Sequence, residues 1–523
     1  MSLIRKASAA LAVSVSSLAA VGLSAALWFT PAQTRAAASA FKPNIIVILA
    51  DDLGYGDTSP YGSKIVRTPN LDALAASGVR FTDGHVTHPV CSPSRAGLLT
   101  GRYQERFGWE FNPKGRDKGN GVSLNEIMLP QVMKTAGYAT GMIGKWHLGQ
   151  PRPYYPTARG FDSFFGMAGG GSGYIVDPKP GDEFESKGSD DELDDVAQAQ
   201  PAPVDLTKLK QQLEAARARA PITRNGVVVN ETAYLTEAFT REALNFIDAH
   251  RRQPFFLYLA YNAPHRPLQV TKKYYDRFPD IGSKPRRIRA AMISAMDDGI
   301  GAVVARLKAD GLDQNTLIFF LSDNGCPDLD GACSNGPLVG FKRWHFEGGI
   351  RVPFMVSWPG HMPAGRVDNR TVSSLDIFPT AVAAAHGTLP ADRPYDGVDL
   401  MPYLTGKNSH APNPLLYWRA GPTFAIRDGN WKMIMADLAP PEASVAHGKA
   451  RNADSATFGQ HIMLYDLTLS PVETDNLATQ QQNTVARLQG ELSDWNKLLV
   501  PPVWVSKTQH YVKQDGVMVH LYD

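Results

Sequence analysis

Four uninterrupted apolar runs alternate with segments of helical spacing along most of the chain. The apolar runs cover residues 44–50, 138–144, 254–261 and 316–322. Runs of this kind are typical of parallel strands that are buried on both faces. The segments of helical spacing lie between them, at 69–77, 123–137, 231–250 and 286–311. The alternation predicts an α/β fold in which helices sandwich a large mixed, mostly parallel sheet.

Two regions depart from this pattern. Residues 175–225 are acidic and interrupted by Pro and Gly, then rich in Ala, Gln and Lys, so we expect a surface insertion there. From about residue 388 short strand-like segments and turns dominate, and residues 479–499 have the spacing of an amphipathic helix. We therefore expect a large domain over 41–387 and a smaller α+β domain with an antiparallel sheet over 388–523.

The first 40 residues have a composition of their own. Arg5 and Lys6 lead into an uncharged stretch of Ala, Ser, Leu and Val, and "AAASA" supplies small residues for cleavage. This predicts a signal peptide cut near Ala40/Phe41 and a periplasmic or secreted protein with no stable membrane insertion after cleavage. An uncleaved membrane anchor is the alternative, although the stretch is weakly apolar for a spanning helix.

Charge and cysteine content narrow the partners and the compartment. The chain has 53 Lys and Arg against 51 Asp and Glu, without a basic block, so a nucleic-acid partner is not expected. Cys326 and Cys333 lie seven residues apart in a loop rich in Pro, Gly and Asp. In an exported protein we expect them to form a disulfide, with two free thiols as the alternative. Cys91, the third cysteine, is then left without a partner.

Polar residues directly follow two of the apolar runs. Asp51 and Asp52 come after the first run, and Asp323 and Asn324 come after the fourth. Because parallel strands end at the same edge of a sheet, we expect these four side chains to converge. Their oxygen atoms suit Ca²⁺, with Mg²⁺ as the alternative, and the lack of His/Cys ligand spacing disfavours zinc. Solvated turns are the other interpretation of each pair taken alone.

Basic residues follow the other strand ends. Lys145 and His147 come after the second apolar run, His265 comes after the third, and Lys342 lies in a Gly-rich loop. Cations that converge with a metal ion form a pocket for a tetrahedral anion, and histidines can move protons for its ester. A structural role remains the alternative for any single histidine.

The segment "CSPSRAGLLTGR" at 91–102 resembles the signature of the formylglycine-dependent (type I) sulfatases, which belong to the alkaline-phosphatase-like superfamily. The segments "DDLGYGD", "GKWHLG", "NAPHRP", "SDNG" and "KRWHFEGGIRVP" follow that family's order within residues 44–360. "LYDLTLSPVETDNLA" at 464–478 resembles its C-terminal domain. The resemblance thus covers nearly the whole chain after the predicted signal peptide.

The resemblance implies a specific nucleophile. A separate maturation enzyme would oxidise Cys91 to Cα-formylglycine, whose hydrated aldehyde attacks sulfur and forms a covalent sulfate intermediate. The modified residue 91 would join Asp51, Asp52, Asp323 and Asn324 as a calcium ligand, and Arg95 would fix the hydrate.

The resemblance also assigns the basic residues. Lys145 and Lys342 would bind the sulfate oxygens, and His147 would take the proton that lets sulfate leave residue 91. His265 would protonate the leaving alcohol, with Lys342 as the alternative acid.

The expected activity is the hydrolysis of a sulfate monoester. Aromatic and basic residues in or beside the expected catalytic loops, Trp146, Arg343, Trp344 and His345, suit a sugar substrate, although loop packing is an equal interpretation of each. We therefore expect a sulfated carbohydrate as substrate. The alternatives are a phosphonate or phosphate ester hydrolase on the same fold, and a non-catalytic carbohydrate-binding protein if Cys91 is not converted.

Overall fold

A computed structural model of the protein describes residues 42–114, 119–185, 206–327, 331–439, 459–469, 472–506 and 509–522. The chain from Lys42 onwards forms one compact unit. The predicted signal peptide and residues 186–205 of the predicted insertion lie outside the described residues. Among the described helices, none combines the length and the apolar character needed to cross a bilayer.

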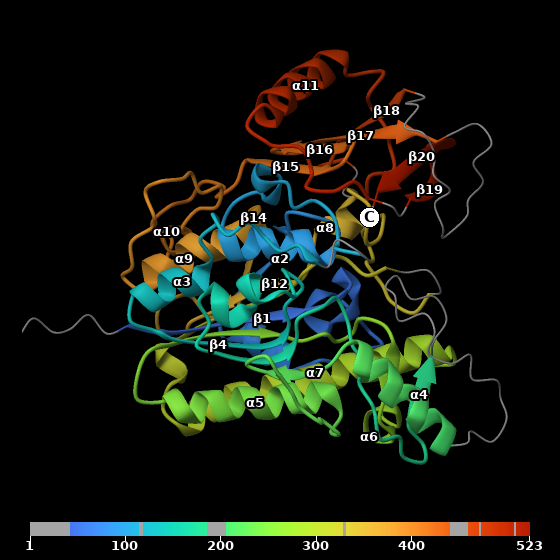
Figure 1. Ribbon diagram of the computed structural model, residues 1–523. Helices are drawn as coiled ribbons and strands as arrows, with labels where there is room; N and C mark the ends of the chain where they lie inside the picture. The colour runs from blue at the N-terminus through green and yellow to red at the C-terminus, as the bar shows by residue number, and fades with distance from the viewer. Residues whose placement is uncertain are drawn as a thin grey trace, which may run out of the picture. The chain divides into compact units, whose positions relative to one another are not determined.

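A ten-stranded sheet forms the centre of this unit (Figure 1). Its strand order is β13-β2-β12-β11-β1-β9-β4-β5-β7-β8. The five central strands are mutually parallel: β11 (Thr316–Ser322), β1 (Asn44–Ala50), β9 (Phe255–Ala260), β4 (Ala139–Lys145) and β5 (Ser163–Met167). The flanks hold β13 (Arg366–Asp368), β2 (Val79–Phe81), β12 (Phe354–Ser357), β7 (Thr223–Arg224) and β8 (Val227–Val228). The four predicted strands are thus present, each within one residue of its expected limits.

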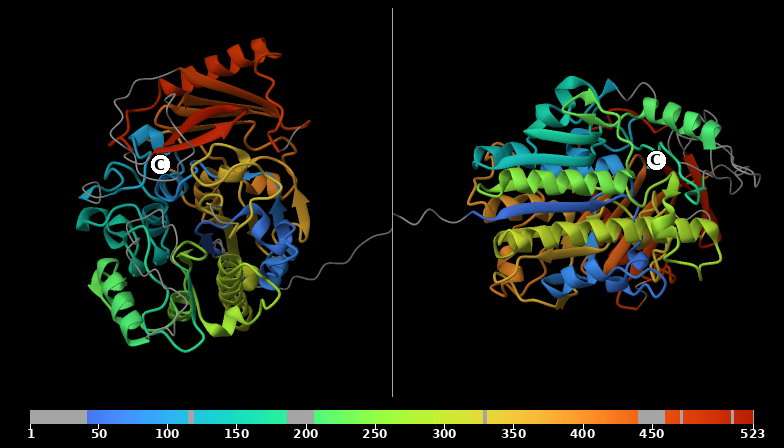
Figure 2. Two further views of the ribbon diagram at one scale, coloured as in Figure 1. Left: turned by 90° about the vertical axis from the view of Figure 1, so that its right-hand side faces the viewer. Right: turned by 90° about the horizontal axis from the view of Figure 1, so that it is seen from below.

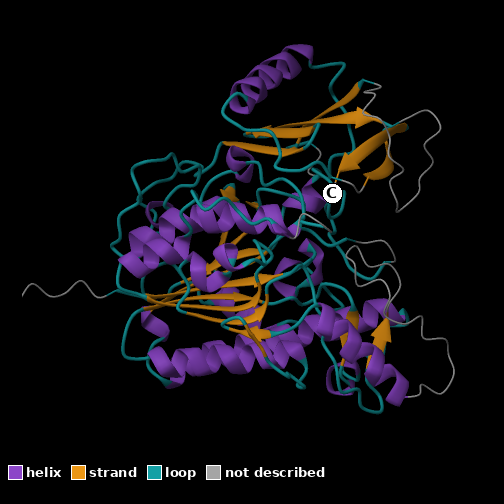
Figure 3. Cartoon of the chain, viewed as in Figure 1, coloured by secondary structure: helices purple, strands orange, loops and turns teal. Residues whose placement is uncertain are grey.

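Helices cover both faces of this sheet (Figure 3). One face carries α1 (Pro69–Ala76), α5 (Leu235–His250) and α7 (Lys284–Ala309), and the view from below in Figure 2 shows α5 and α7 running along the strands. The other face carries α2 (Cys91–Thr100), α3 (Leu129–Thr135) and α9 (Ile377–Ala384). Successive side chains of β1 point to opposite faces of the sheet. Ile45 and Val47 belong to the core under α2, α3 and α9, and Ile46 belongs to the core under α1, α5 and α7.

Two predicted helices begin later than expected. α3 starts at Leu129 instead of 123. Pro130 fits only the first turn of a helix, and a proline also restricts the backbone conformation of the residue before it. α5 starts at Leu235 instead of 231, and the backbone N–H of Leu235 donates to Tyr174 O, outside the helix.

Shorter elements complete this part of the chain. The helices are α4 (Leu206–Arg219), α6 (Lys272–Tyr275), α8 (Glu347–Ile350) and α10 (Met401–Leu404). Two small sheets pair β10 (Leu268–Val270) with β6 (Glu183–Glu185), and β14 (Val372–Ser373) with β3 (Gly84–His85). The predicted insertion therefore contributes the strands β6 and β7 and the helix α4 to the described structure.

A six-stranded antiparallel sheet follows towards the C-terminus. Its strands are β15 (Leu415–Ala420), β16 (Thr423–Asp428), β17 (Trp431–Leu438), β18 (Gln460–Asp466), β19 (Gln509–Gln514) and β20 (Val517–Tyr522). Helix α11 (Gln482–Asn496) packs on one face through Leu488, Leu492 and Trp495. Trp418 and Ile434 from the sheet belong to the same core as α2 and α9. The predicted fold class is confirmed, whereas the domain boundary at 387/388 stays a prediction.

Candidate active site

The four acidic and amide residues predicted to converge lie together at the carboxyl edge of the large sheet. In the parallel register Ala50 lies opposite Ser322, so the residues that follow β1 and β11 are neighbours. The backbone N–H of Asp52 donates to Asp323 Oδ1 (3.2 Å), and Asn324 Nδ2 donates to Asp52 Oδ1 (2.6 Å). Asp52 has φ +63°, which turns the chain sharply after Asp51. All four side chains are buried.

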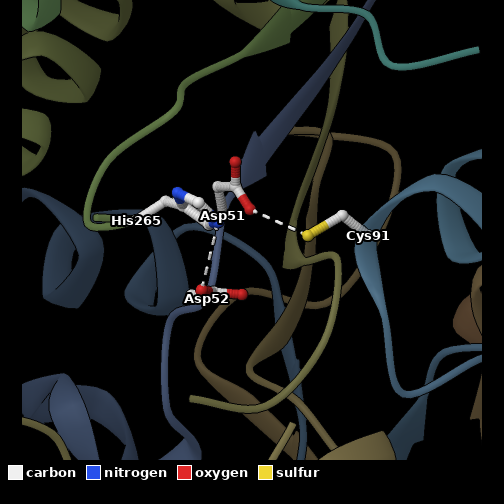
Figure 4. Close-up of side chains that lie close together, drawn as sticks. All are labelled: Asp51, Asp52, Cys91 and His265. Carbon is white, nitrogen blue, oxygen red and sulfur yellow. Dashed lines mark hydrogen bonds and ion pairs between the residues drawn. The ribbon is translucent and has the colours of Figure 1, made fainter. Parts of the chain in front are cut away.

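Cys91 is the first residue of α2, and its side chain points at Asp51 (Figure 4). Its Sγ lies 3.4 Å from Asp51 Oδ1, and the residue is completely buried. Ser92 fixes this end of the helix: its backbone N–H donates to Asn112 Oδ1 (2.9 Å), and its hydroxyl donates to His147 O (2.5 Å). Burial raises the pKa of the Cys91 thiol well above its usual range, so an unmodified thiolate is disfavoured here.

Three buried cations contact the acidic residues. Arg95 Nε donates to Asp323 Oδ2 (2.9 Å), Lys145 Nζ lies 2.7 Å from Asp51 Oδ2, and Lys342 Nζ lies 3.1 Å from Asp52 Oδ2.

These contacts change the acidity of the carboxyl groups. Burial would raise the pKa of Asp51, but Lys145, His265 and Arg95 outweigh it and hold the pKa far below its usual range. Burial, together with the charge of Asp51, raises the pKa of Asp323 to about 7 in spite of Arg95.

The two predicted catalytic histidines occupy different places. His265 Nε2 lies 3.6 Å from Asp52 Oδ2, and its Nδ1 lies 2.6 Å from Arg266 O. The carbonyl therefore fixes Nδ1 as the protonated nitrogen and leaves Nε2 towards the acidic residues. Burial lowers the pKa of His265, although the charges of Asp51 and Asp52 favour its cationic form. His147 adopts φ +63°, and its backbone N–H donates to Ala168 O (3.2 Å).

The donor set fits a divalent cation. One ligand atom from each of Asp51, Asp52, Cys91 and His265 lies within 4.8 Å of the others. Asn324 Oδ1 is buried, and among the described residues it has no hydrogen-bond partner. An oxygen acceptor buried without a donor is rare unless an ion or water completes it. Together with the three carboxylates this suits the hard cation Ca²⁺ or Mg²⁺.

The residues predicted to face a sugar are mainly packed into the loops. Trp146 is completely buried, donates through Nε1 to Tyr154 O (3.0 Å) and packs edge-on against Phe161. The loop-packing interpretation therefore holds for Trp146, and we do not assign it to a substrate surface.

The other three residues of this group lie in the loop that carries Lys342. Trp344 packs edge-on against Phe341, and His345 is buried with its ring centroid 6.3 Å from that of His88. Arg343 is also buried, and its backbone N–H donates to Pro89 O (2.9 Å). Their positions tie this loop to the segment before Cys91.

Two further features hold the site loops: the expected disulfide between Cys326 and Cys333, and a hydrogen bond of Glu473, which the sequence analysis did not single out. Cys326 and Cys333 are joined in a disulfide, and Cys326 O accepts the backbone N–H of Lys342 (3.0 Å). Glu473, near the C-terminal sheet, accepts the N–H of Glu347, five residues after Lys342. The glutamate in "LYDLTLSPVETDNLA" was the available signal for this contact.

The fold and the site together define a class of enzyme. Oxygen atoms that can bind a metal ion at the carboxyl edge of a mostly parallel sheet, a cysteine at a helix start and two buried lysines suit the hydrolysis of an ester of a tetrahedral anion.

Comparison with known proteins identifies the family. The sulfatase family model matches residues 43–388, and the chain belongs to the sulfatases, which are sulfuric ester hydrolases. The N-acetylgalactosamine-6-sulfatase of Mus musculus is 34% identical over 412 residues, covering 76% of this chain and 72% of the relative. Arylsulfatase A of Bos taurus is 35% identical over 465 residues, covering 86% and 87%. The resemblance stated from the motifs is confirmed.

A solved structure agrees with this assignment. It is Ps i-CgsB in complex with k-i-k-neocarrahexaose, which superposes with a TM-score of 0.74 at 34% identity. The match covers 88% of this chain and 94% of that one.

Proposed function

We propose that this sulfatase removes sulfate from a sulfated carbohydrate and that its nucleophile is formylglycine made from Cys91. The observation that carries the proposal is the placement of Cys91 at the start of α2, with its Sγ 3.4 Å from Asp51 Oδ1. Two similar proteins support the substrate class: an N-acetylgalactosamine-6-sulfatase, and a protein solved in complex with k-i-k-neocarrahexaose.

The metal would be held by Asp51, Asp52, Asp323, Asn324 and the modified residue 91. Bound Ca²⁺ would supply positive charge that acidifies a coordinated hydroxyl and neutralises sulfate oxygens. Formylglycine would supply a geminal pair of hydroxyls, of which one can attack sulfur and the other can lose a proton to release sulfate.

The basic residues of the chain would divide the remaining tasks. Lys145 and Lys342, each within 3.1 Å of a metal-site carboxylate, would bind sulfate oxygens. Arg95, which bonds Asp323, would hold residue 91 and its carboxylate neighbours in place. The cationic form of His265 would protonate the leaving alcohol through Nε2, because Nδ1–H stays engaged with Arg266 O. His147 would take the proton from residue 91. Its backbone lies next to that residue, because the His147 carbonyl accepts the Ser92 hydroxyl.

The proposal includes export and maturation. Residues 1–40 would be removed near Ala40/Phe41. The mature protein would consist of the domains 41–387 and 388–523 and would act in the periplasm or outside the cell. A separate enzyme would convert Cys91. N-terminal sequencing of protein purified from its native host would test the cleavage.

Two measurements test the catalytic proposal. Mass spectrometry of the peptide that contains residue 91, from native-host protein, should show the aldehyde or its hydrate; a thiol alone would contradict the nucleophile. Matured protein should turn over 4-nitrophenyl sulfate faster than 4-nitrophenyl phosphate. A preference for phosphate would instead support a phosphate ester hydrolase on this fold.

A further inference from the structure

A cavity of about 250 Å³ lies beside His147 and is separate from the cluster of metal-site carboxylates. Its wall comes from the loops after β4 and β5, from the segment after α4 and from Lys114. Ligand pockets usually measure about 300–1,000 Å³. This cavity therefore has room for a single sugar ring and not for a long oligosaccharide.

The lining of the cavity has a clear charge preference. Lys114 and Arg219 contribute cationic side chains, Gln150 and Thr223 contribute neutral polar ones, and the described lining residues include no carboxylate. A concave surface lined by one sign of charge concentrates ligands of the opposite sign. The chemistry of the wall thus favours an anionic ligand.

Three consecutive glycines keep the cavity open next to His147. Gly169, Gly170 and Gly171 line it together. A Cβ on Gly170 would lie 2.8 Å from His147 Nε2, and a Cβ on Gly169 would lie 3.3 Å from Gln150 Nε2. At Gly170 a side chain would therefore force the His147 ring to shift, so the glycine keeps this part of the cavity free.

Short hydrogen bonds link the wall of the cavity to Ser92, the residue that follows the nucleophile position. The His147 carbonyl accepts the Ser92 hydroxyl (2.5 Å), and Asn112, two residues before Lys114, accepts the Ser92 N–H (2.9 Å). A ligand in the cavity would therefore lie next to a substrate whose sulfate reaches residue 91.

We infer that this cavity is a subsite for a second anionic group, a sulfate or carboxylate on the sugar ring that adjoins the one being desulfated, with Arg219 and Lys114 as its binding residues. The inference rests on the proposed function. It makes the preferred substrate an oligosaccharide with anionic groups on neighbouring rings, and not an isolated sulfated monosaccharide.

Competition against 4-nitrophenyl sulfate tests the subsite. The competitors are a sulfated carrageenan tetrasaccharide and its neutral agarose-type counterpart, each measured with wild type, Arg219→Glu, Lys114→Ala and the matched surface control Arg252→Glu. We expect the sulfated competitor to bind wild type more tightly than the neutral one. Arg219→Glu should weaken binding of the sulfated competitor about tenfold or more, because the variant loses a charge-assisted contact and adds a like charge. Lys114→Ala should have a smaller effect in the same direction, and Arg252→Glu should have none.

Calorimetric titration of the same two oligosaccharides distinguishes failure of the proposed function from failure of the subsite. If 4-nitrophenyl sulfate is not turned over but Arg219→Glu still weakens binding of the sulfated competitor, the proposed function fails and the subsite stands. Equal affinity for both competitors in wild type, or the same loss in Arg219→Glu and Arg252→Glu, would overturn the subsite.

Discussion

Two of the buried charge clusters among the described residues invite comparison, because each brings three carboxylates together with three cations. The first, the site cluster, contains Asp51, Asp52, Asp323, Arg95, Lys145 and Lys342. The second, the junction cluster, lies where the segments before Cys91 and after Lys342 meet the C-terminal sheet. It contains Asp83, Glu347, Glu473, Arg351, Arg427 and Lys432, with His85 among them.

In the junction cluster every carboxylate oxygen has a nitrogen partner within 3.1 Å, although Glu473 Oε1 meets Lys432 only as an ion pair. Arg427 contacts both oxygens of Asp83 at 2.8 Å, and Lys432 Nζ lies 2.8 Å from Glu347 Oε1 and 2.7 Å from Glu473 Oε1. The remaining oxygens face the His85 ring (3.1 Å) and the Glu347 N–H (2.6 Å). Asp83, His85 and Glu347 come as close together as metal ligands do, but arginine and lysine already supply the positive charge.

The site cluster differs in what it leaves incomplete. Asn324 Oδ1 is buried without a hydrogen-bond partner among the described residues, and Cys91 and His265 face the carboxylates. The comparison teaches that a group of buried acids does not by itself indicate a metal. A buried neutral acceptor without a hydrogen-bond donor among the described residues, such as Asn324 Oδ1, is the better sign of a ligand.

Cys91→Ala, a change in the site cluster, should have the largest effect on turnover. We expect turnover of 4-nitrophenyl sulfate to fall by at least about 10⁴-fold, because the variant cannot form the nucleophile. Circular dichroism and thermal unfolding should show an intact fold. Cys91→Ser, which provides only one hydroxyl, should also lose multiple turnover. Sustained turnover by either variant would refute the assignment.

Metal content should separate the two clusters. Asp51→Asn and Asp83→Asn make the same change in the site cluster and in the junction cluster. We expect Asp51→Asn to lose the bound divalent cation and Asp83→Asn to keep it, as measured by inductively coupled plasma mass spectrometry. In the wild type, excess Ca²⁺ at 100 times its Kd should add about 2.7 kcal/mol of stability. Equal metal loss in both variants would show that the two clusters do not differ in metal binding.

The sequence was informative where one local pattern sufficed. The apolar runs predicted β1 and β11, and parallel register then placed Asp51 beside Asp323. The junction cluster escaped prediction because its members are spread from residue 83 to residue 473, and each looks like an ordinary strand or loop residue. Trp146 was ambiguous for another reason, since its position beside Lys145 does not reveal whether the ring faces a pocket or the core.

Lys432→Met should weaken folding more than it weakens chemistry. The substitution leaves Glu347 and Glu473 buried without their shared ammonium, which should cost about 3–5 kcal/mol of unfolding free energy. Lys497→Met, which removes an exposed pair with Asp494, is the matched control and should cost less than about 1 kcal/mol. Urea unfolding measures both. A similar small cost for the two variants would show that the junction cluster contributes little to stability.

The smallest expected effect concerns pH. Burial, together with the charge of Glu347, raises the pKa of Glu473 from 4.5 to about 7 in spite of Lys432. The folded protein then binds this proton more tightly than the unfolded chain does, so its contribution to stability is complete below pH 4.5 and is lost as the pH rises towards 7. Glu473→Gln keeps an acceptor for the Glu347 N–H but cannot titrate. Between pH 4.5 and 7 its unfolding free energy should therefore fall less steeply than that of wild type, by at most about 1.4 kcal/mol per pH unit. Parallel stability curves for the two proteins would show that Glu473 is ionised throughout and that Lys432 neutralises both glutamates at once.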